Sequence, residues 1–415
     1  MNDSAKQTVI LGGGFVGLFT ALHLSKQGYS QPVMLIDQNE RFGFKPLLYE
    51  LLSGEIEEQQ ICPRYEKLLD GSDVQFIQDT VKEIDLPNRG VELAKNRHLT
   101  YHHLVLALGS LVGYFGIEGA TENTLPFRTQ KQAIALFGHL QNCLEQARQT
   151  TDSQKRQTLL TVAIIGAGPA GVELAATLGD VLPHWYIQLG GNFSEIRLVL
   201  INRGSQILKG DINSKLREAA ETALKERSVP VELQLNASVS AVYPQRVEFE
   251  RNNCQESLEA ATIVWTTGTT THPLIKSLPI PDSHRDKKGR LLVAPTLQLP
   301  HFPEVLAGGD CATDLQQPLP PTAQVAYQQG GAIAKSLKAL SEEKRPPHAR
   351  IQLRGSLLKL GLEEGGANLF EKFVLTGKSA HLIRQGMYLT LLPTPVRNFQ
   401  ATTEWLSEEI FQPYL

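Results

Sequence analysis

The sequence has 415 residues, with 40 Lys and Arg against 43 Asp and Glu and a formal net charge of −3. At roughly 150 residues per domain, this length predicts two or three domains. The charge lacks the basic excess that a nucleic-acid-binding protein needs. Hydrophobic residues make up 41% of the chain, which excludes a disordered protein.

The cysteines are widely separated in the sequence: Cys62, Cys143, Cys254 and Cys311. They form no CxxC motif and no Cys/His spacing, so we expect no disulfide framework, no metal site and no dithiol redox motif. The N-terminus lacks a basic region followed by a cleavage site, which predicts a protein of the reducing cytosol.

The chain begins with an uncharged stretch, residues 7–25, whose length is close to the roughly 20 residues of a membrane span. Glycines interrupt this stretch, so we predict a strand over 8–11, a tight turn and a helix. The turn has the GxGxxG spacing of a dinucleotide-binding loop, where a helix N-terminus receives the diphosphate. The predicted binding residues are Gly12, Gly14, Phe15, Val16 and Gly17.

An acidic residue ends the next predicted strand, over 33–37. Asp37 can accept hydrogen bonds from both ribose hydroxyls of a dinucleotide. A tight turn alone would not explain an acid at this place. Short strands follow over 74–106, the last of them leading to Gly109, and a helix is predicted over 129–149.

The opening pattern then returns, with a strand over 161–165, a second GxGxxG turn and a helix over 172–178. We therefore predict a second nucleotide-binding unit. We interpret residues 180–196 as an insertion before the next strand. A later strand, over 262–268, mirrors the strand that leads to Gly109. The predicted binding glycines of this unit are Gly166, Gly168, Gly171 and Gly268.

The second unit differs from the first at the end of its second strand. Asn202-Arg203 stands where the first unit has Asp37. An acid there would repel a 2′-phosphate, whereas Arg203 can bind one by charge-assisted hydrogen bonds. This difference favours NADPH, with NADH as the alternative if Arg203 is only a solvated turn residue.

A third strand, over 305–307, is followed by Gly309-Asp310, and a helix is predicted over 323–340. The alternation of strands and helices predicts an α/β protein with two Rossmann-like domains and a C-terminal α+β segment. The predicted boundaries are 1–125 with 295–345 for the first domain, 126–294 for an inserted second domain and 346–415 for the last.

These features together resemble the flavoproteins with two dinucleotide-binding domains. The resemblance implies FAD in the first domain and NAD(P)H in the second. It also implies that Asp310 hydrogen-bonds the ribityl or phosphate part of the flavin, the alternative being a helix N-cap. The helix beginning near Ala323 would direct its positive end at the flavin.

Three segments, 44–50, 171–175 and 321–329, resemble the type II NAD(P)H:quinone dehydrogenases. The resemblance implies a hydride transfer to flavin, followed by the transfer of two electrons to a lipid-soluble quinone. Its implied catalytic residues are Glu173, Gln324 and Gln328, and Pro46 would pack near the flavin. The alternatives are an N-terminal helix acid for Glu173, a solvated polar face for the two glutamines and an ordinary loop proline for Pro46.

The C-terminal segment interleaves apolar residues with the basic residues Lys378, His381, Arg384 and Arg397, and Trp405, Ile410, Phe411 and Tyr414 could extend its surface. Such a helix can lie in one leaflet of a membrane, with its basic residues at the headgroups. Packing on the body of the protein or against a second copy of the chain is the alternative. The membrane would be a thylakoid or plasma membrane, approached from the cytoplasmic face.

The resemblance is strongest to the cyanobacterial and plastid branch, which includes demethylphylloquinone reductases. Phylloquinone biosynthesis is therefore one predicted role, and respiratory reduction of plastoquinone is another. A ferredoxin-type reductase, an oxygen-reducing enzyme and a redox-sensing flavoprotein remain alternatives on the same scaffold.

Overall fold

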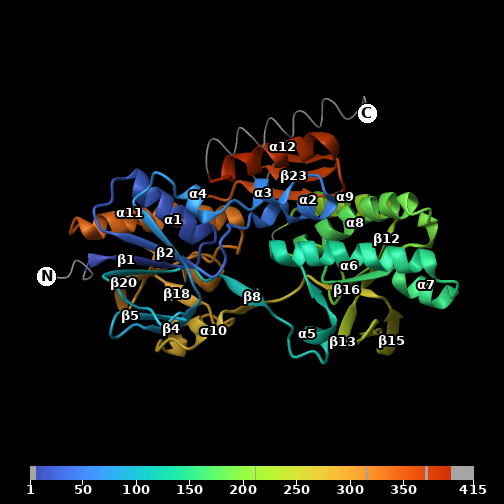
Figure 1. Cartoon of the computed structure of the whole chain (residues 1–415), viewed down its shortest axis with the longest axis horizontal. Coiled ribbons are helices and arrows are strands. Elements are labelled where there is room, and N and C mark those ends of the chain that lie inside the picture. The colour runs from blue at the N-terminus through green and yellow to red at the C-terminus, as the bar shows by residue number, and fades with distance from the viewer. Residues whose placement is uncertain (1–5, 211, 315, 370–372, 394–415) are drawn as a thin grey trace.

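The computed structural model describes residues 6–210, 212–314, 316–369 and 373–393. Figure 1 shows two lobes side by side, each with its own sheet, and a C-terminal piece lying across both. The α/β class and the two dinucleotide-binding folds are confirmed.

The first lobe is built on a sheet with the strand order β19-β20-β7-β1-β2-β3, in which β20 to β3 run parallel and β19 antiparallel. The strands are β1 (Thr8–Leu11), β2 (Val33–Asp37), β3 (Val74–Gln78), β7 (His103–Leu106), β19 (Gln298–Leu299) and β20 (Phe302–Ala307). All four residues of β1 are buried because the strand is central and covered on both faces.

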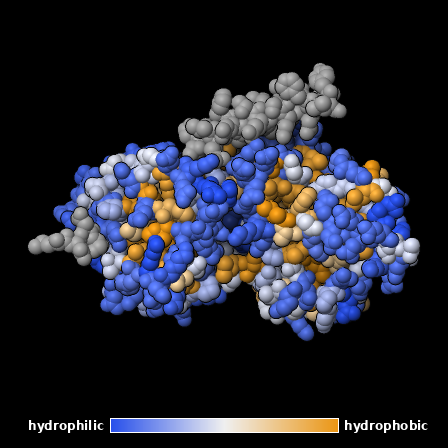
Figure 2. All heavy atoms as spheres, viewed as in Figure 1, coloured by the Kyte–Doolittle hydropathy of each residue, from blue (hydrophilic) through white to orange (hydrophobic). Residues whose placement is uncertain are grey.

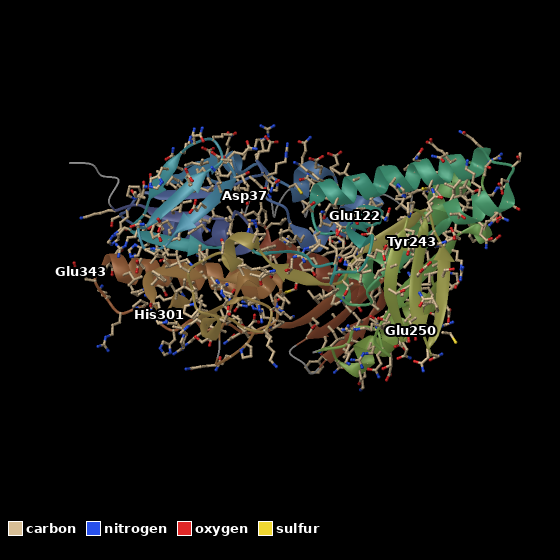
Figure 3. The ribbon with its side chains drawn as sticks, turned by 90° about the horizontal axis from the view of Figure 1, so that it is seen from below. Asp37, Glu122, Tyr243, Glu250, His301 and Glu343 are labelled. Atoms are coloured by element: carbon tan, nitrogen blue, oxygen red, sulfur yellow. The ribbon has the colours of Figure 1, made fainter. Side chains whose placement is uncertain are left out.

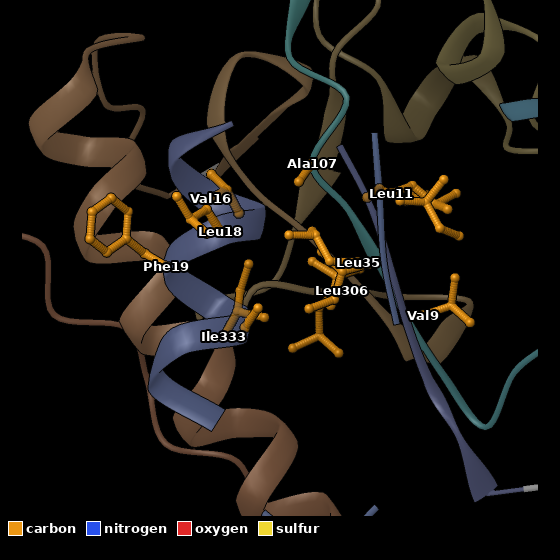
Figure 4. Packing of buried hydrophobic residues seen from close by; sticks show 14 of the residues in the cluster. Val9, Leu11, Val16, Leu18, Phe19, Leu35, Ala107, Leu306 and Ile333 are labelled. Atoms are coloured by element: carbon orange, nitrogen blue, oxygen red, sulfur yellow. The ribbon is translucent and has the colours of Figure 1, made fainter. Parts of the chain in front are cut away.

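Two helices, α1 (Phe15–Lys26) and α11 (Ala323–Ser341), pack together on one face of this sheet. In Figure 4, Ile333 of α11 lies beside Leu35 and Leu306 of the sheet, whereas Phe19 of α1 points away from the sheet, toward α11. Fully burying one such side chain contributes about 1.5–3 kcal/mol. This packing fixes the helix N-termini at the carboxyl edge of the sheet.

Smaller elements complete the first lobe. A three-stranded antiparallel sheet follows β3, and a two-stranded parallel sheet lies near η5. The elements are η2 (Lys45–Leu47), α2 (Leu48–Ser53), α3 (Glu58–Ile61), α4 (Tyr65–Leu68), β4 (Val81–Asp85), β5 (Gly90–Leu93), β6 (His98–Thr100), α10 (Pro273–Lys276), η4 (Asp282–His284), β18 (Leu291–Val293), η5 (Gly309–Cys311) and β21 (Ala312–Asp314).

The second lobe has an all-parallel sheet with the order β12-β11-β10-β16-β9 and a separate antiparallel sheet of β13, β14 and β15. Figure 3 shows Tyr243 and Glu250 on that antiparallel sheet, across the molecule from Asp37. The elements are α5 (Ala120–Asn123), β9 (Leu125–Pro126), α6 (Gln130–Gln149), α7 (Ser153–Leu159), β10 (Thr161–Ile165), α8 (Pro169–Gln188), η3 (Phe193–Glu195), β11 (Arg197–Asn202), α9 (Ser214–Lys225), β12 (Val231–Leu235), β13 (Ala237–Tyr243), β14 (Arg246–Arg251), β15 (Cys254–Glu259) and β16 (Thr262–Trp265).

The two lobes are joined by a pair of antiparallel strands, β8 (Ser110–Val112) and β17 (Thr269–Thr271). The chain crosses to the second lobe through β8 and returns through β17. On the face shown in Figure 2, hydrophobic side chains gather where the lobes meet and on the second lobe. The boundary predicted between residues 125 and 126 falls inside β9, after the crossover.

Residues 180–196, interpreted from the sequence as an insertion, form the second half of α8 and the segment around η3. Helix α8 continues through Pro183 to Gln188, and η3 then leads directly into β11. Val181 and Tyr186 are buried, so the apolar face of the helix extends past the proline. The long connection is therefore a long helix.

The C-terminal piece consists of a three-stranded antiparallel sheet and one helix. These are β22 (Gly355–Lys359), β23 (Gly365–Leu369), β24 (Phe373–Thr376) and α12 (Gly377–Leu391). Among the described residues, no helix has the length and apolarity to cross a membrane. The sequence predictions for Arg397, Trp405, Ile410, Phe411 and Tyr414 fall outside the described residues.

Candidate active site

The first glycine loop has the geometry of a dinucleotide cradle. Gly12 has a φ of +99°, and a Cβ added to Gly17 would lie 1.9 Å from the Gly12 carbonyl oxygen. Around Gly14, the N-cap of α1, an added Cβ would meet no atom within 4 Å. The first-turn N–H groups of α1 therefore face an open space that can accept a diphosphate.

Asp37 ends β2 beside this loop. Its Oδ2 accepts a hydrogen bond from the backbone N–H of Gly13 at 2.7 Å, and its Oδ1 accepts one from the N–H of Asn39 at 2.8 Å. The Tyr65 hydroxyl donates to the Gly13 carbonyl at 2.8 Å. These contacts fix the carboxylate at the edge of the sheet, next to the cradle.

The second loop repeats this geometry. Gly166 has a φ of +107°, and a Cβ on Gly171 would lie 1.8 Å from the Gly166 carbonyl oxygen. Gly168, the N-cap of α8, has open space around it. Two units of this kind on two parallel sheets define a protein that binds two dinucleotides.

The strand register shows which residue replaces Asp37 in the second unit. Leu11 pairs with Ile36 in the first sheet, and Ile165 pairs with Ile201 in the second. Asn202 is therefore the structural equivalent of Asp37, as the sequence predicted.

The Asn202 amide is used within its own turn. Its Oδ1 accepts from the Ala167 N–H at 3.4 Å, and its Nδ2 donates to the carbonyls of Gly204 at 3.1 Å and Gln206 at 3.0 Å. Asn202 thus shapes the turn, beside which the Arg203 side chain is exposed to solvent.

Asp310 lies in η5, close to the end of β7. Its Oδ2 accepts a hydrogen bond from the Ser110 hydroxyl at 2.7 Å and forms an ion pair with Arg128 at 3.4 Å. The Gly309 N–H donates to Oε1 of the buried Gln329 at 2.7 Å. Asp310 is not a helix N-cap, since α11 is capped by Thr322. Ser110 and Arg128 carry no sequence signal because their partner is more than 180 residues away.

The remaining predicted cofactor-binding residues lie at the link between the lobes and in the first lobe. Gly109 and Gly268 both have left-handed backbones, with φ of +66° and +78°, at the two ends of the β8–β17 link. Ala323 is the first residue of α11. Pro46 lies in η2, and its carbonyl accepts a hydrogen bond from Arg384 at 2.9 Å.

Glu173 is buried in the first turns of α8, with an exposed fraction of 7%. Its Oε1 accepts a hydrogen bond from the backbone N–H of Lys359 at 2.8 Å and lies 3.9 Å from Nε of Arg384. Desolvation raises the pKa of Glu173 to about 7; Arg384 and the Lys359 N–H oppose this rise without cancelling it. Glu173 therefore exchanges a proton near neutral pH.

The interpretation of His381 and Arg384 as headgroup contacts is wrong. Their exposed fractions are 4% and 0%. Arg384 instead forms a buried ion pair with Glu50 of α2, at 2.5 Å. The sequence could not show this pairing because its partners lie 334 residues apart.

Gln324 and Gln328 share one face of α11, as predicted, but this face is covered by the segment 352–355. The Gln324 amide exchanges hydrogen bonds with the Gly355 carbonyl and the Arg354 N–H, at 2.9 and 3.1 Å. The Gln328 amide donates to the Gln352 carbonyl and accepts from the Gln352 N–H, both at 2.9 Å. Both glutamines position this segment, and direct contact with a quinone stays a prediction.

We expect Gln328→Leu to free the Gln352 amide. A leucine can neither donate to nor accept from the backbone, so hydrogen exchange at Gln352 should become at least about 10-fold faster, corresponding to about 1.4 kcal/mol. Mass-spectrometric or NMR hydrogen exchange measures this change. Gln328→Glu, which keeps the acceptor, is the control; equal exchange in all three proteins would contradict the assignment.

The cysteines are all free thiols, and only Cys254 is exposed. Burial raises the pKa of Cys311 to about 11, and its Sγ donates to the Leu106 and Gly308 carbonyls. The described residues contain no group of three or more His, Cys, Asp and Glu side chains arranged to hold a metal ion.

Comparisons with known proteins agree with this geometry. Residues 6–330 match the family model described as pyridine nucleotide-disulphide oxidoreductase. The chain is 33% identical to the demethylphylloquinone reductase NdbB of Synechocystis sp., covering 99% of this chain and 98% of that protein. It is 30% identical to an alternative NAD(P)H-ubiquinone oxidoreductase of Arabidopsis thaliana, covering 98% and 82%.

Among solved structures, NDH2 from Plasmodium falciparum in complex with NADH has the same fold, with a TM-score of 0.87 and 17% identity, covering 97% of this chain and 98% of that chain. The match over residues 6–330 shows that the protein belongs to the pyridine nucleotide-disulphide oxidoreductase family. Within that class, the chain belongs to the type II NAD(P)H:quinone oxidoreductase family.

Proposed function

We propose that this protein is an FAD-dependent NAD(P)H:quinone oxidoreductase that favours NADPH. The observation that carries the proposal is the pair of glycine cradles together with the buried acid Glu173, two residues after Gly171. FAD, when bound, supplies the hydride acceptor and the two-electron donor. The first cradle and Asp37 would hold its diphosphate and ribose, and Asp310 its ribityl or phosphate part.

The preference for NADPH is supported by Asn202 and Arg203. The neutral amide of Asn202 lies where the first unit has a carboxylate, so a 2′-phosphate meets no repulsion there. The exposed guanidinium of Arg203 can donate to that phosphate.

Proton supply is the role we propose for Glu173. Reduction of a quinone to a quinol consumes two electrons and two protons, and a hydride brings only one of these protons. The second must come from the protein or from solvent. A buried carboxyl with a pKa of about 7 is half protonated at neutral pH, which suits a general acid.

We expect Glu173→Gln to slow the quinone half-reaction about 10²- to 10⁴-fold, the usual contribution of a general acid, with little change in flavin reduction. In the parent, the quinone step should slow above about pH 7, because Glu173 must be protonated to donate. Stopped-flow absorbance at several pH values follows each half-reaction separately. An unchanged quinone step with an unchanged pH profile would remove Glu173 from this role.

The identity of the quinone substrate is proposed from sequence similarity to known proteins. The reductase of Synechocystis sp. is named for demethylphylloquinone, and we propose a naphthoquinone of this kind as the substrate. Plastoquinone in a respiratory role is the second candidate. Steady-state rates with both quinones, using NADPH and NADH, decide between them.

We propose that the C-terminal piece docks peripherally on a membrane, from the cytoplasmic face. Its described surface exposes four large apolar side chains: Leu353, Phe373, Leu375 and Leu382. Exposed apolar side chains of this kind can enter the headgroup region without a helix that spans the bilayer. A dimer through the same surface is the alternative, which the mass of the protein in solution tests.

A further inference from the structure

A cluster of five charged side chains lies where α2, α8, β22 and α12 meet. Lys359 and Arg384 are completely buried, and so is Glu50. Lys359 Nζ lies 3.3 Å from Glu50 and 2.5 Å from Glu55, whose side chain is 27% exposed. Arg384 pairs with Glu50 at 2.5 Å, and Glu173 completes the cluster.

The cluster carries an excess of acid. Three carboxyl groups face two cations, so full ionisation would leave one uncompensated negative charge inside the protein. The neighbours add no further cation: desolvation, Lys359 and Arg384 lower the pKa of His381 to about 4, which keeps the ring neutral. Tyr49 and Tyr388 are the other titratable neighbours, and burial raises the pKa of both hydroxyls. Full charge compensation within the cluster therefore requires a proton on one of the three carboxyl groups.

The geometry decides which carboxyl stays ionised. Glu50 contacts both cations, and their attraction outweighs its desolvation and lowers its pKa. Glu173 accepts hydrogen bonds from the Lys359 backbone N–H and the Tyr49 hydroxyl, and its nearest cation, Arg384, is 3.9 Å away. Glu173 and Glu55 are therefore the carboxyl groups that favour the protonated form. Desolvation is the main cause of the raised pKa of each.

The orientation of Arg384 also favours pairing with Glu50 over pairing with Glu173. It donates to Glu50 and to the Pro46 carbonyl, and it lies over the Tyr388 ring at 4.8 Å from the centroid. Its Nε, the atom nearest to Glu173, has no hydrogen-bond partner. Glu50 therefore directs the guanidinium toward α2 and away from full pairing with Glu173.

We propose that Glu50 is a positioning residue: it holds Lys359 and Arg384 toward α2 and thereby leaves the neighbouring carboxyl of Glu173 without a full ion-pair partner. The use of the Glu173 proton in quinone reduction rests on the proposed function. The electrostatic coupling between Glu50 and Glu173 does not. No direct contact between Glu50 and the substrate is involved.

Glu50→Gln removes the competing charge and retains the shape of the side chain. Lys359 and Arg384 then compensate Glu173, so its pKa should fall by about 1–2 units, the usual effect of a neighbouring cation. Glu50→Gln leaves two buried cations with fewer partners and so can destabilise the fold. A second variant, Glu50→Gln with Lys359→Met, removes one negative and one positive charge together. The pKa of Glu173 should still fall, since Arg384 is released in both variants, but by less than in Glu50→Gln, since the charge of Lys359 is lost.

The test is a pH titration of the Glu173 carboxyl by infrared difference spectroscopy, with Glu173→Gln identifying its band. Glu50→Asp, which keeps the charge, should restore most of the parent value, and Glu55→Gln, which does not contact Arg384, should shift it less than Glu50→Gln. An unchanged Glu173 titration in the two folded Glu50→Gln proteins would overturn the proposal. If this titration shifts while the pH profile of the quinone step does not, the coupling stands and the proton-donor role of Glu173 fails.

Discussion

Gly17→Ala is expected to abolish FAD binding by breaking the fold of the first lobe. The added Cβ would lie 1.9 Å from the Gly12 carbonyl oxygen and 3.1 Å from the Ile10 side chain. A backbone oxygen cannot rotate away as a flexible side chain can, so helix α1 must move off the sheet. We expect the free energy of unfolding to fall by more than about 3 kcal/mol, at the upper end of overpacking effects.

The matched control is Gly14→Ala, in the same loop. An added Cβ there meets no atom within 4 Å, so the melting temperature of the flavin-free protein should stay within about 2 °C of the parent. FAD affinity should still fall, because the methyl group faces the place predicted for the diphosphate. Thermal unfolding and flavin content of the purified variants are the measurements. Equal stability of the two variants would contradict the assigned loop geometry.

Arg203→Ala is expected to produce the largest change in cofactor selectivity. A charge-assisted contact to the 2′-phosphate is worth about 1.5–3 kcal/mol, so kcat/KM for NADPH should fall about 10- to 150-fold. The value for NADH should change less than about 3-fold, because NADH has no group at that place. Steady-state kinetics with both nucleotides give the ratio.

Asn202→Asp is the complementary variant. A carboxylate oxygen can still accept from the Ala167 N–H, as Asp37 accepts from the Gly13 N–H. It would repel the 2′-phosphate and accept from ribose hydroxyls, so it should disfavour NADPH and modestly favour NADH. If the parent already prefers NADH, or if Arg203→Ala keeps the parent ratio, Arg203 does not read the phosphate.

Much of this site could be predicted from the sequence because its signals are local. The spacing of Gly12, Gly14 and Gly17 prescribes a turn and a helix N-terminus whatever surrounds them. A short distance along the chain then links each loop to the end of the next strand, at Asp37 or Asn202. The strand register bears out that alignment.

The tertiary structure alone decided the interior of the active site. Lys359 and Glu50 are 309 residues apart, and no spacing rule connects them. The sequence left open whether the helix with Arg384 lies at a membrane surface or packs on the body of the protein, and a lone cation is costly to bury. The burial of Arg384 is possible only because folding brings Glu50 and Glu173 to it from two other elements. The contacts of Ser110 and Arg128 with Asp310 could not be predicted for the same reason. Charge pairing depends on distance in space, whereas a glycine turn depends on neighbouring residues in the chain.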